Sequence, residues 1–117
     1  MSDAQDKLLQ GEMNMTLNMT FMTSARDAVG KCLAELGDKH DDMLVLTADV
    51  DTSSRIQAFK EKYPDRCYNV GIAEQNLVSI AAGLAKCGKK AFAASPACFL
   101  STRSYEQCKV DCAYSNT

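Results

Sequence analysis

Apolar residues in the first half of the chain repeat first at helical and then at strand spacing. Within 23–36 they recur every three or four positions, which predicts a helix capped by Thr23 or Ser24. Gly37 is expected to end this helix. The following run, 43–48, is almost continuously apolar and bounded by charged residues, a pattern typical of a strand that is covered on both faces of a parallel sheet.

The alternation of helix and strand continues downstream. Ser53 or Ser54 is expected to cap a short helix that Pro64 closes, and Gly71 to turn the chain into a longer helix. The other predicted elements are a strand at 67–70, a helix at 73–86, a strand at 90–95 and a helix at 99–114. Together they predict an α/β fold, with a parallel sheet between two layers of helices.

A parallel sheet of this size is narrow, and the chain ends after a helix, where a further strand is expected. We therefore expect a truncated fold, completed by another chain or by further sequence. Residues 1–21 are polar and methionine-rich and form an expected N-terminal lead-in. Residues 22–117 form one expected domain that is incomplete at its C-terminus.

Composition and charge exclude several kinds of partner. The 117 residues are 46% apolar and 24% charged, with a net charge of −2 and no long basic run. These values suit a globular domain and argue against a nucleic-acid or membrane partner. The first residues do not resemble a signal peptide or a membrane anchor, so a cytoplasmic location is expected.

The six cysteines stand singly and form no C-x-x-C pair. This spacing argues against a disulfide framework and against a zinc site. We interpret the cysteines as reduced thiols that fill the core, and the sequence offers no candidate metal ligands.

Ligands of parallel α/β sheets bind beyond the carboxyl ends of the strands, which here are followed by residues 49–54, 71–75 and 96–99. Glu74 lies in the second of these segments, after a glycine turn and at the start of an apolar helix. Its carboxylate is therefore placed to face a cleft. The alternative is an ordinary first-turn acid, favoured by the helix dipole.

The stretch Asn69-Val-Gly-Ile-Ala-Glu-Gln-Asn76 resembles the G-I-A-E-Q motif of the pyrimidine-binding domain in transketolases and deoxyxylulose-phosphate synthases. The similarity extends over 22–117. It implies a thiamine-diphosphate enzyme in which Glu74 bonds the N1′ atom of the cofactor's aminopyrimidine. For this role we expect the carboxyl of Glu74 to lie in a desolvated pocket, beside apolar residues such as Ile72, that raises its pKa.

Other site residues follow from the same resemblance. Phe99 and Tyr105 match the family segment whose aromatic residues form the pyrimidine pocket, with core packing as the alternative for each. Asp49 matches an A-D-L segment near the cofactor and the subunit interface. Arg26 and Ser53 occupy positions that hold the substrate phosphate in transketolases; alternatively, Arg26 is a solvated helix residue and Ser53 a helix cap.

The family binds the cofactor's diphosphate through Mg²⁺ with a Gly-Asp-Gly motif, which does not occur in this sequence. The resemblance therefore implies a partner chain, a diphosphate-binding N-terminal transketolase subunit that also holds Mg²⁺. A homodimer or heterotetramer would transfer a two-carbon ketol unit between sugar-phosphate substrates. A part of a deoxyxylulose-phosphate synthase-like enzyme and a non-catalytic association module remain as alternatives.

Overall fold

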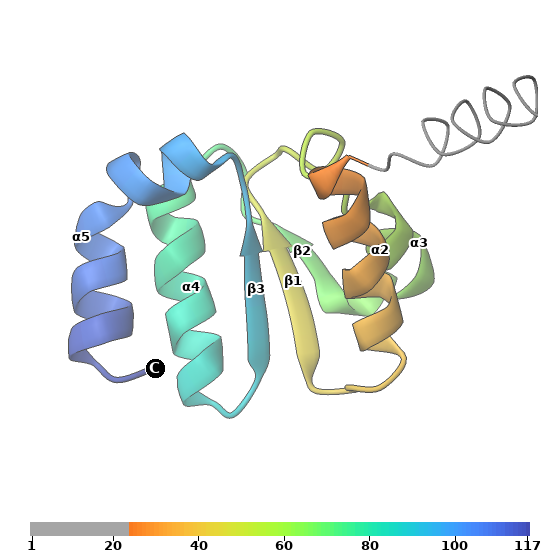
Figure 1. Ribbon diagram of the computed structural model, residues 1–117. Helices are drawn as coiled ribbons and strands as arrows, with labels where there is room; N and C mark the ends of the chain where they lie inside the picture. The colour runs from red at the N-terminus through yellow and green to blue at the C-terminus, as the bar shows by residue number, and fades with distance from the viewer. Residues whose placement is uncertain (1–23) are drawn as a thin grey trace, which may run out of the picture.

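The computed structural model describes residues 24–117; the predicted lead-in, 1–21, lies outside them. A parallel sheet of three strands, in the order β2-β1-β3, forms the middle of the domain (Figure 1). The strands are β1 (Met43–Thr47), β2 (Cys67–Asn69) and β3 (Lys90–Ala94). The continuous apolar run therefore forms the central strand, as its pattern predicts.

Helices cover both faces of the sheet (Figure 1). On one side lie α2 (Ala25–Gly37) and α3 (Gln57–Lys62), and on the other lie α4 (Glu74–Lys86) and the C-terminal segment with α5 (Tyr105–Gln107). This arrangement confirms the predicted three-layer α/β class. A one-turn 3₁₀ helix, Pro64–Arg66, links α3 to β2.

Each face of β1 contributes to its own apolar core, because successive side chains of a strand point to opposite faces. Toward α2 and α3, Val45 and Met43 pack with Leu33, Ile56 and Phe59. Toward α4, the buried side chains are Leu46, Ala48 and Leu77. The helices of both layers thus pack on one strand, in which every residue except the partly exposed Leu44 is buried.

The strand register brings three loops to the same edge of the sheet. Thr47, the last residue of β1, pairs with Asn69 of β2 and with Ala94 of β3, and each of these is also the last residue of its strand. The loops that follow therefore start side by side. This is the edge where the sequence places the candidate ligand-binding residues.

Two predicted helix boundaries are wrong. Ser53 does not cap α3, which starts at Gln57 without a side-chain cap; the Ser53 hydroxyl instead donates to the carbonyl of Val50 over 3.1 Å. Gly37 is the last residue of α2 and not a left-handed stop after it. A Cβ at Gly37 would meet the ring of Tyr63 at 2.5 Å, so this glycine allows a close approach of two elements.

Other boundaries match the sequence. Ser24 caps α2 by accepting the backbone N–H of Asp27 at 3.2 Å. Gly88, after α4, has a φ of 80°, the left-handed conformation of a glycine stop.

The predicted continuous helix at 99–114 is divided into three pieces. Wide, π-type turns form Phe99–Arg103 and Cys108–Tyr114, and α5 lies between them. Hydroxyl groups bond backbone carbonyls here, as Thr102 does with Cys98, and such bonds compete with regular helix geometry. Sequence periodicity does not distinguish these turns from an α-helix.

The prediction that the cysteines fill the core is wrong as a general statement, although the partly buried Cys67 packs against the core beneath α2 and α3. All six are free thiols, but Cys32, Cys87 and Cys98 are exposed and the other three are only partly buried. The exposed cysteines lie on the outer faces or at the ends of helices, where no core reaches them.

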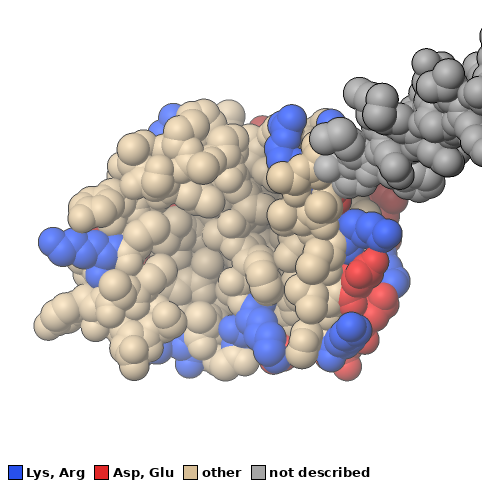
Figure 2. Space-filling model, in the orientation of Figure 1, with Lys and Arg blue, Asp and Glu red and all other residues tan. Residues whose placement is uncertain are grey.

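Charged side chains are distributed unevenly over the surface. In Figure 2 the acidic residues gather on the side of α2 and α3, while the surface over β3 and α4 is mostly uncharged. Within residues 24–117, no helix has the length and apolar character that a membrane span needs.

Candidate functional site

Unusual backbone conformations mark the loops at the carboxyl edge of the sheet. Gly71, between β2 and α4, has a φ of 79°, which glycine adopts without strain. Asp49, directly after the buried end of β1, has a φ of 60°. Aspartate tolerates this left-handed conformation better than most residues, but some strain remains. Both turns redirect the chain sharply, so that polar groups collect at this edge.

Glu74, the first residue of α4, is the charged residue buried most deeply in the described chain, with 3% of its surface exposed. Its carboxylate oxygen Oε2 lies 2.8 Å from Nη1 of Arg103. The carboxylate side chain is 4% exposed, whereas that of Arg103 is 48% exposed. A buried carboxylate is stable only with a charged or hydrogen-bonding partner, and Arg103 provides one.

Phe99 is the second residue that Arg103 contacts. The guanidinium carbon of Arg103 lies 4.3 Å from the centre of the Phe99 ring, within the range of a cation–π contact. The wide turn over Phe99–Arg103 carries both side chains. Arg103 therefore touches the aromatic face and the buried carboxylate at once, and we call these three residues the Glu74 corner.

The expected rise in the pKa of Glu74 is not found. The carboxylate lies against its own backbone N–H and accepts a hydrogen bond from Arg103, and these contacts hold its pKa below the ordinary value. Burial acts in the opposite direction but is the weaker influence. The prediction was wrong because sequence neighbours do not reveal a cation 29 positions downstream.

Two residues predicted for the pyrimidine pocket stand largely in solvent. Ile72 is 79% exposed and Tyr105 is 64% exposed, so neither encloses Glu74 within the described chain. The exposure of Tyr105 also excludes its alternative as a core residue. Phe99 is only partly buried. The binding roles of all three stay predictions.

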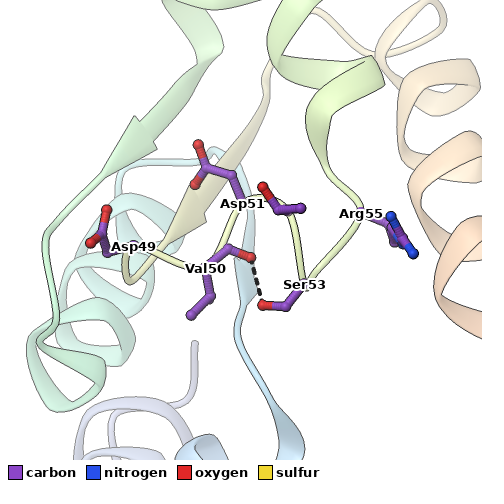
Figure 3. A pocket seen from close by; sticks show the side chains of 6 residues that line it. Asp49, Val50, Asp51, Ser53 and Arg55 are labelled. Carbon is purple, nitrogen blue, oxygen red and sulfur yellow. Dashed lines mark hydrogen bonds between the residues drawn. The ribbon is translucent and has the colours of Figure 1, made fainter.

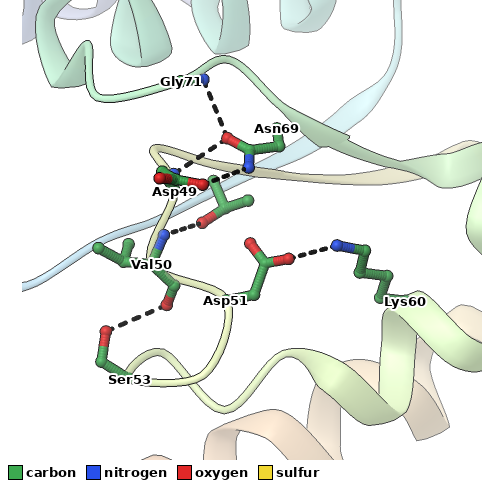
Figure 4. Close-up of polar contacts among 8 residues, drawn as sticks. Asp49, Val50, Asp51, Ser53, Lys60, Asn69 and Gly71 are labelled. Carbon is green, nitrogen blue, oxygen red and sulfur yellow. Dashed lines mark hydrogen bonds and ion pairs between the residues drawn. The ribbon is translucent and has the colours of Figure 1, made fainter.

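Asn69 connects the loop after β1 to the turn before α4 (Figure 4). Its oxygen Oδ1 accepts the backbone N–H groups of Asp49, at 3.0 Å, and of Gly71, at 2.9 Å. Its Nδ2 donates to the Asp49 carboxylate over 2.9 Å. One carboxamide thus holds Asp49 in its left-handed conformation and shapes the turn that leads to Glu74.

The loop after β1 surrounds a hollow of about 490 Å³, lined by Asp49, Val50, Asp51, Thr52, Ser53 and Arg55 (Figure 3). Asp51 is held by an ion pair with Lys60 on α3. Nη1 of Arg26 donates to the carbonyl of Ser53 over 3.4 Å. The structure therefore places Asp49 and Ser53 around one hollow, and Arg26 contacts the backbone of Ser53.

Two residues of the site escape the sequence analysis. Asn69 lies within the motif but receives no role from it, although an asparagine two residues before a turn glycine is a known signal for side-chain bonding to the turn. Arg103 carries no such signal. Its pairing with Glu74 depends on the packing of the C-terminal segment on α4.

Replacement of Asn69 by alanine should lower the free energy of unfolding by about 1–2 kcal/mol. The variant loses three hydrogen bonds, but the exposed amides of the loop can bond water instead. Urea unfolding followed by circular dichroism measures the change. Asn76→Ala, at an exposed position on α4, is the matched control and should not destabilise. Equal stabilities of the two variants would contradict the connecting role of Asn69.

Within residues 24–117, no three His, Cys, Asp or Glu side chains gather closely enough to hold a metal ion. The site can offer a buried carboxylate, an aromatic face and polar loop groups. Groups of these kinds can bind a flat ring that carries a hydrogen-bond donor.

Comparison with known proteins gives the family of the domain. Residues 22–117 match the family described as "Transketolase, pyrimidine binding domain". The chain is 43% identical over 81 residues to a "Putative transketolase C-terminal section" of Methanocaldococcus jannaschii, covering 69% of this chain and 26% of that protein. It is also 43% identical over 94 residues to one of the apulose-4-phosphate transketolase subunits of Phocaeicola vulgatus, covering 80% of this chain and 30% of that protein.

A solved structure agrees with these relatives. It is described as "Split gene transketolase, inactive beta4 tetramer" and superposes with a TM-score of 0.70 at 41% sequence identity. The match covers 77% of this chain and 30% of that chain. The chain therefore spans about a third or less of the length of these relatives.

Proposed function

Because this chain belongs to the family of transketolase pyrimidine-binding domains, we propose that it forms the aminopyrimidine-binding half of a thiamine-diphosphate enzyme. The assembled enzyme transfers a two-carbon ketol unit between sugar phosphates. A partner chain supplies the diphosphate-binding half and its Mg²⁺. The proposal accounts for a sequence that has the pyrimidine-domain motif around Glu74 but no Gly-Asp-Gly.

The observation that carries this proposal is the fit of the Glu74 corner to an aminopyrimidine ring. A ring protonated at N1′ is flat, cationic and able to donate an N–H to a carboxylate. The guanidinium of Arg103 has the same three properties, and it touches both Glu74 and Phe99. The corner thus accepts a group of this shape and charge.

Each residue of the corner has a separate task in the proposal. Glu74 holds a proton between its carboxylate and N1′, and burial excludes water from that hydrogen bond. Phe99 offers its ring face for stacking, which contributes about 1 kcal/mol beyond area burial. When bound, the cofactor supplies the electron sink at the substrate carbonyl. Ile72 and Tyr105, exposed in this chain, face the cofactor or the partner chain.

The hollow beside β1 is the proposed substrate side of the site. Asp49 lies next to the cofactor and the subunit interface. Arg26 and Ser53 hold the sugar phosphate, since a guanidinium fork and a hydroxyl suit phosphate oxygens. Their side-by-side placement supports this assignment.

A second chain is part of the proposal for two reasons. The relatives are described as a C-terminal section and as one subunit of a transketolase, and the solved neighbour as an inactive tetramer of one split-gene chain. In addition, residues 24–117 contain no cluster of three His, Cys, Asp or Glu side chains that could hold the cofactor's Mg²⁺, so we assign this ion to the partner. We propose a homodimer or a heterotetramer that forms the site at an interface.

The test is calorimetric titration of thiamine diphosphate and Mg²⁺ into this chain alone and into its mixture with a chain bearing a Gly-Asp-Gly diphosphate domain. Binding is expected only in the mixture, and removal of Mg²⁺ with a chelator should abolish it. No binding in either sample contradicts the enzyme proposal and leaves the association module. Equally tight binding by the chain alone contradicts the need for a partner.

A further inference from the structure

Arg103 occupies a central position in the Glu74 corner, and the sequence motif gives it no role. Its guanidinium lies on the Phe99 ring, with 4.3 Å between the guanidinium carbon and the ring centre. One of its N–H groups donates to the Glu74 carboxylate at 2.8 Å. Arg103 therefore fills the space between the two groups to which an aminopyrimidine would bind.

The carboxylate of Glu74 requires such a partner while no ligand is bound. It is 4% exposed, and a buried charge without a counterion is strongly destabilising. Arg103 and a ring protonated at N1′ satisfy it in the same way, each with an N–H donor and a positive charge. Arg103 contacts the same carboxylate and the same ring that the proposed ligand would contact, so the two groups compete for this position.

The side chain of Arg103 also has access to solvent. Almost half of its side chain is exposed, in contrast to the carboxylate that it covers. It is the last residue of a wide π-type turn, and Ser104 after it has non-helical backbone angles, φ −104° and ψ 21°. Turns of this kind occur often at functional sites. The side chain can therefore swing into solvent without unpacking the core.

We propose that Arg103 is a placeholder: it occupies the aminopyrimidine position in the cofactor-free chain and is displaced when the ring binds. This inference rests on the proposed function and assigns a new residue to it. Arg103 neutralises Glu74 and shields it until the cofactor arrives. It also sets the affinity, because only the fraction of molecules with Arg103 displaced can accept the ring.

The placeholder predicts a distinctive binding rate. Release of an exposed side chain is fast, so in the wild-type assembly the observed rate rises with thiamine-diphosphate concentration at a slope that is reduced by the small fraction of molecules with Arg103 displaced. In Arg103→Met the site is open, so the slope is steeper over the same range. The affinity should increase about tenfold, the equivalent of one charged hydrogen bond.

The experiment uses this chain assembled with its diphosphate-binding partner and Mg²⁺. Stopped-flow mixing gives the rates, and calorimetry gives the dissociation constants for thiamine diphosphate. Lys109→Met is the matched control, since it removes one positive charge from an exposed position of the same C-terminal segment. It should behave as the wild type does.

A second variant and a second measurement keep the test decisive if Arg103→Met does not fold. Arg103→Lys keeps the charge that neutralises Glu74 but lacks the flat, stacking group, so an affinity between those of wild type and Arg103→Met is expected. In the unliganded wild-type chain, nuclear magnetic resonance should show slowed rotation of the Arg103 guanidinium. Cofactor binding should remove this restriction.

The outcomes separate the two proposals. Tighter binding and a steeper association rate in Arg103→Met than in the wild type support the placeholder. Unchanged or weaker binding, with normal binding by the wild type, overturns the placeholder and leaves the proposed function standing. If neither the wild type nor any variant binds thiamine diphosphate, both proposals are wrong.

Discussion

Replacement of Glu74 by glutamine should slow activation of the cofactor by about 10²–10⁴-fold, the range for loss of a positioned acid or base. Glutamine keeps the size of the side chain but cannot share a proton with N1′. Exchange of the C2 hydrogen of bound thiamine diphosphate with solvent deuterium measures this step without knowledge of the sugar substrates. The assembly with the diphosphate-binding partner is the sample to use.

Glu106→Gln is the matched control, because it makes the same chemical change at an exposed position on α5. It should leave the exchange rate as in the wild type. The Glu74 variant should remain folded, since a neutral amide is easier to bury than a carboxylate. Rapid exchange in folded, cofactor-bound Glu74→Gln would remove Glu74 from its proposed role.

Replacement of Gly30 by alanine should lower the free energy of unfolding by about 3 kcal/mol, the upper part of the range for overpacked sites. A Cβ at this buried position on α2 would lie 1.9 Å from the backbone oxygen of Arg55. Backbone cannot yield as a side chain does, so α2 and the loop around the hollow must move apart. Urea unfolding gives the change in stability.

Gly83→Ala provides the matched control. Gly83 lies inside α4, and no other group lies within 4 Å of the position that a methyl group would take there. Alanine should therefore stabilise by roughly 0.5–1 kcal/mol through helix propensity. The two substitutions are chemically identical and should act in opposite directions. A stable Gly30→Ala variant would show that α2 does not depend on this close contact.

The architecture could be predicted from the sequence because local patterns determine it. The apolar run of β1 and the helical spacing of α4 each identify one element, and their alternation leaves few topologies. The register follows from these elements, so the prediction that the loops with Asp49, Glu74 and Phe99 share one edge is confirmed. Family resemblance supplies the proposed roles of these residues.

Features that depend on contacts distant in sequence could not be predicted. The sequence suggests that Gly37 is a helix stop, but its role comes from the ring of Tyr63. The sequence also suggests a raised pKa for Glu74, but Arg103 helps to lower it. Neither partner lies within one helical turn of the residue it affects. Patterns read over a short stretch of sequence reflect neighbours along the chain, whereas these effects depend on neighbours in space.

The carboxamide of Asn69 has a consequence for the motions of the domain. Its single oxygen accepts the N–H groups of both Asp49 and Gly71, one from each side of the site. Rotation of this one side chain releases both amides together, so the two loops form one cooperatively opening unit. We therefore expect the loop around the hollow and the turn that leads to Glu74 to open together.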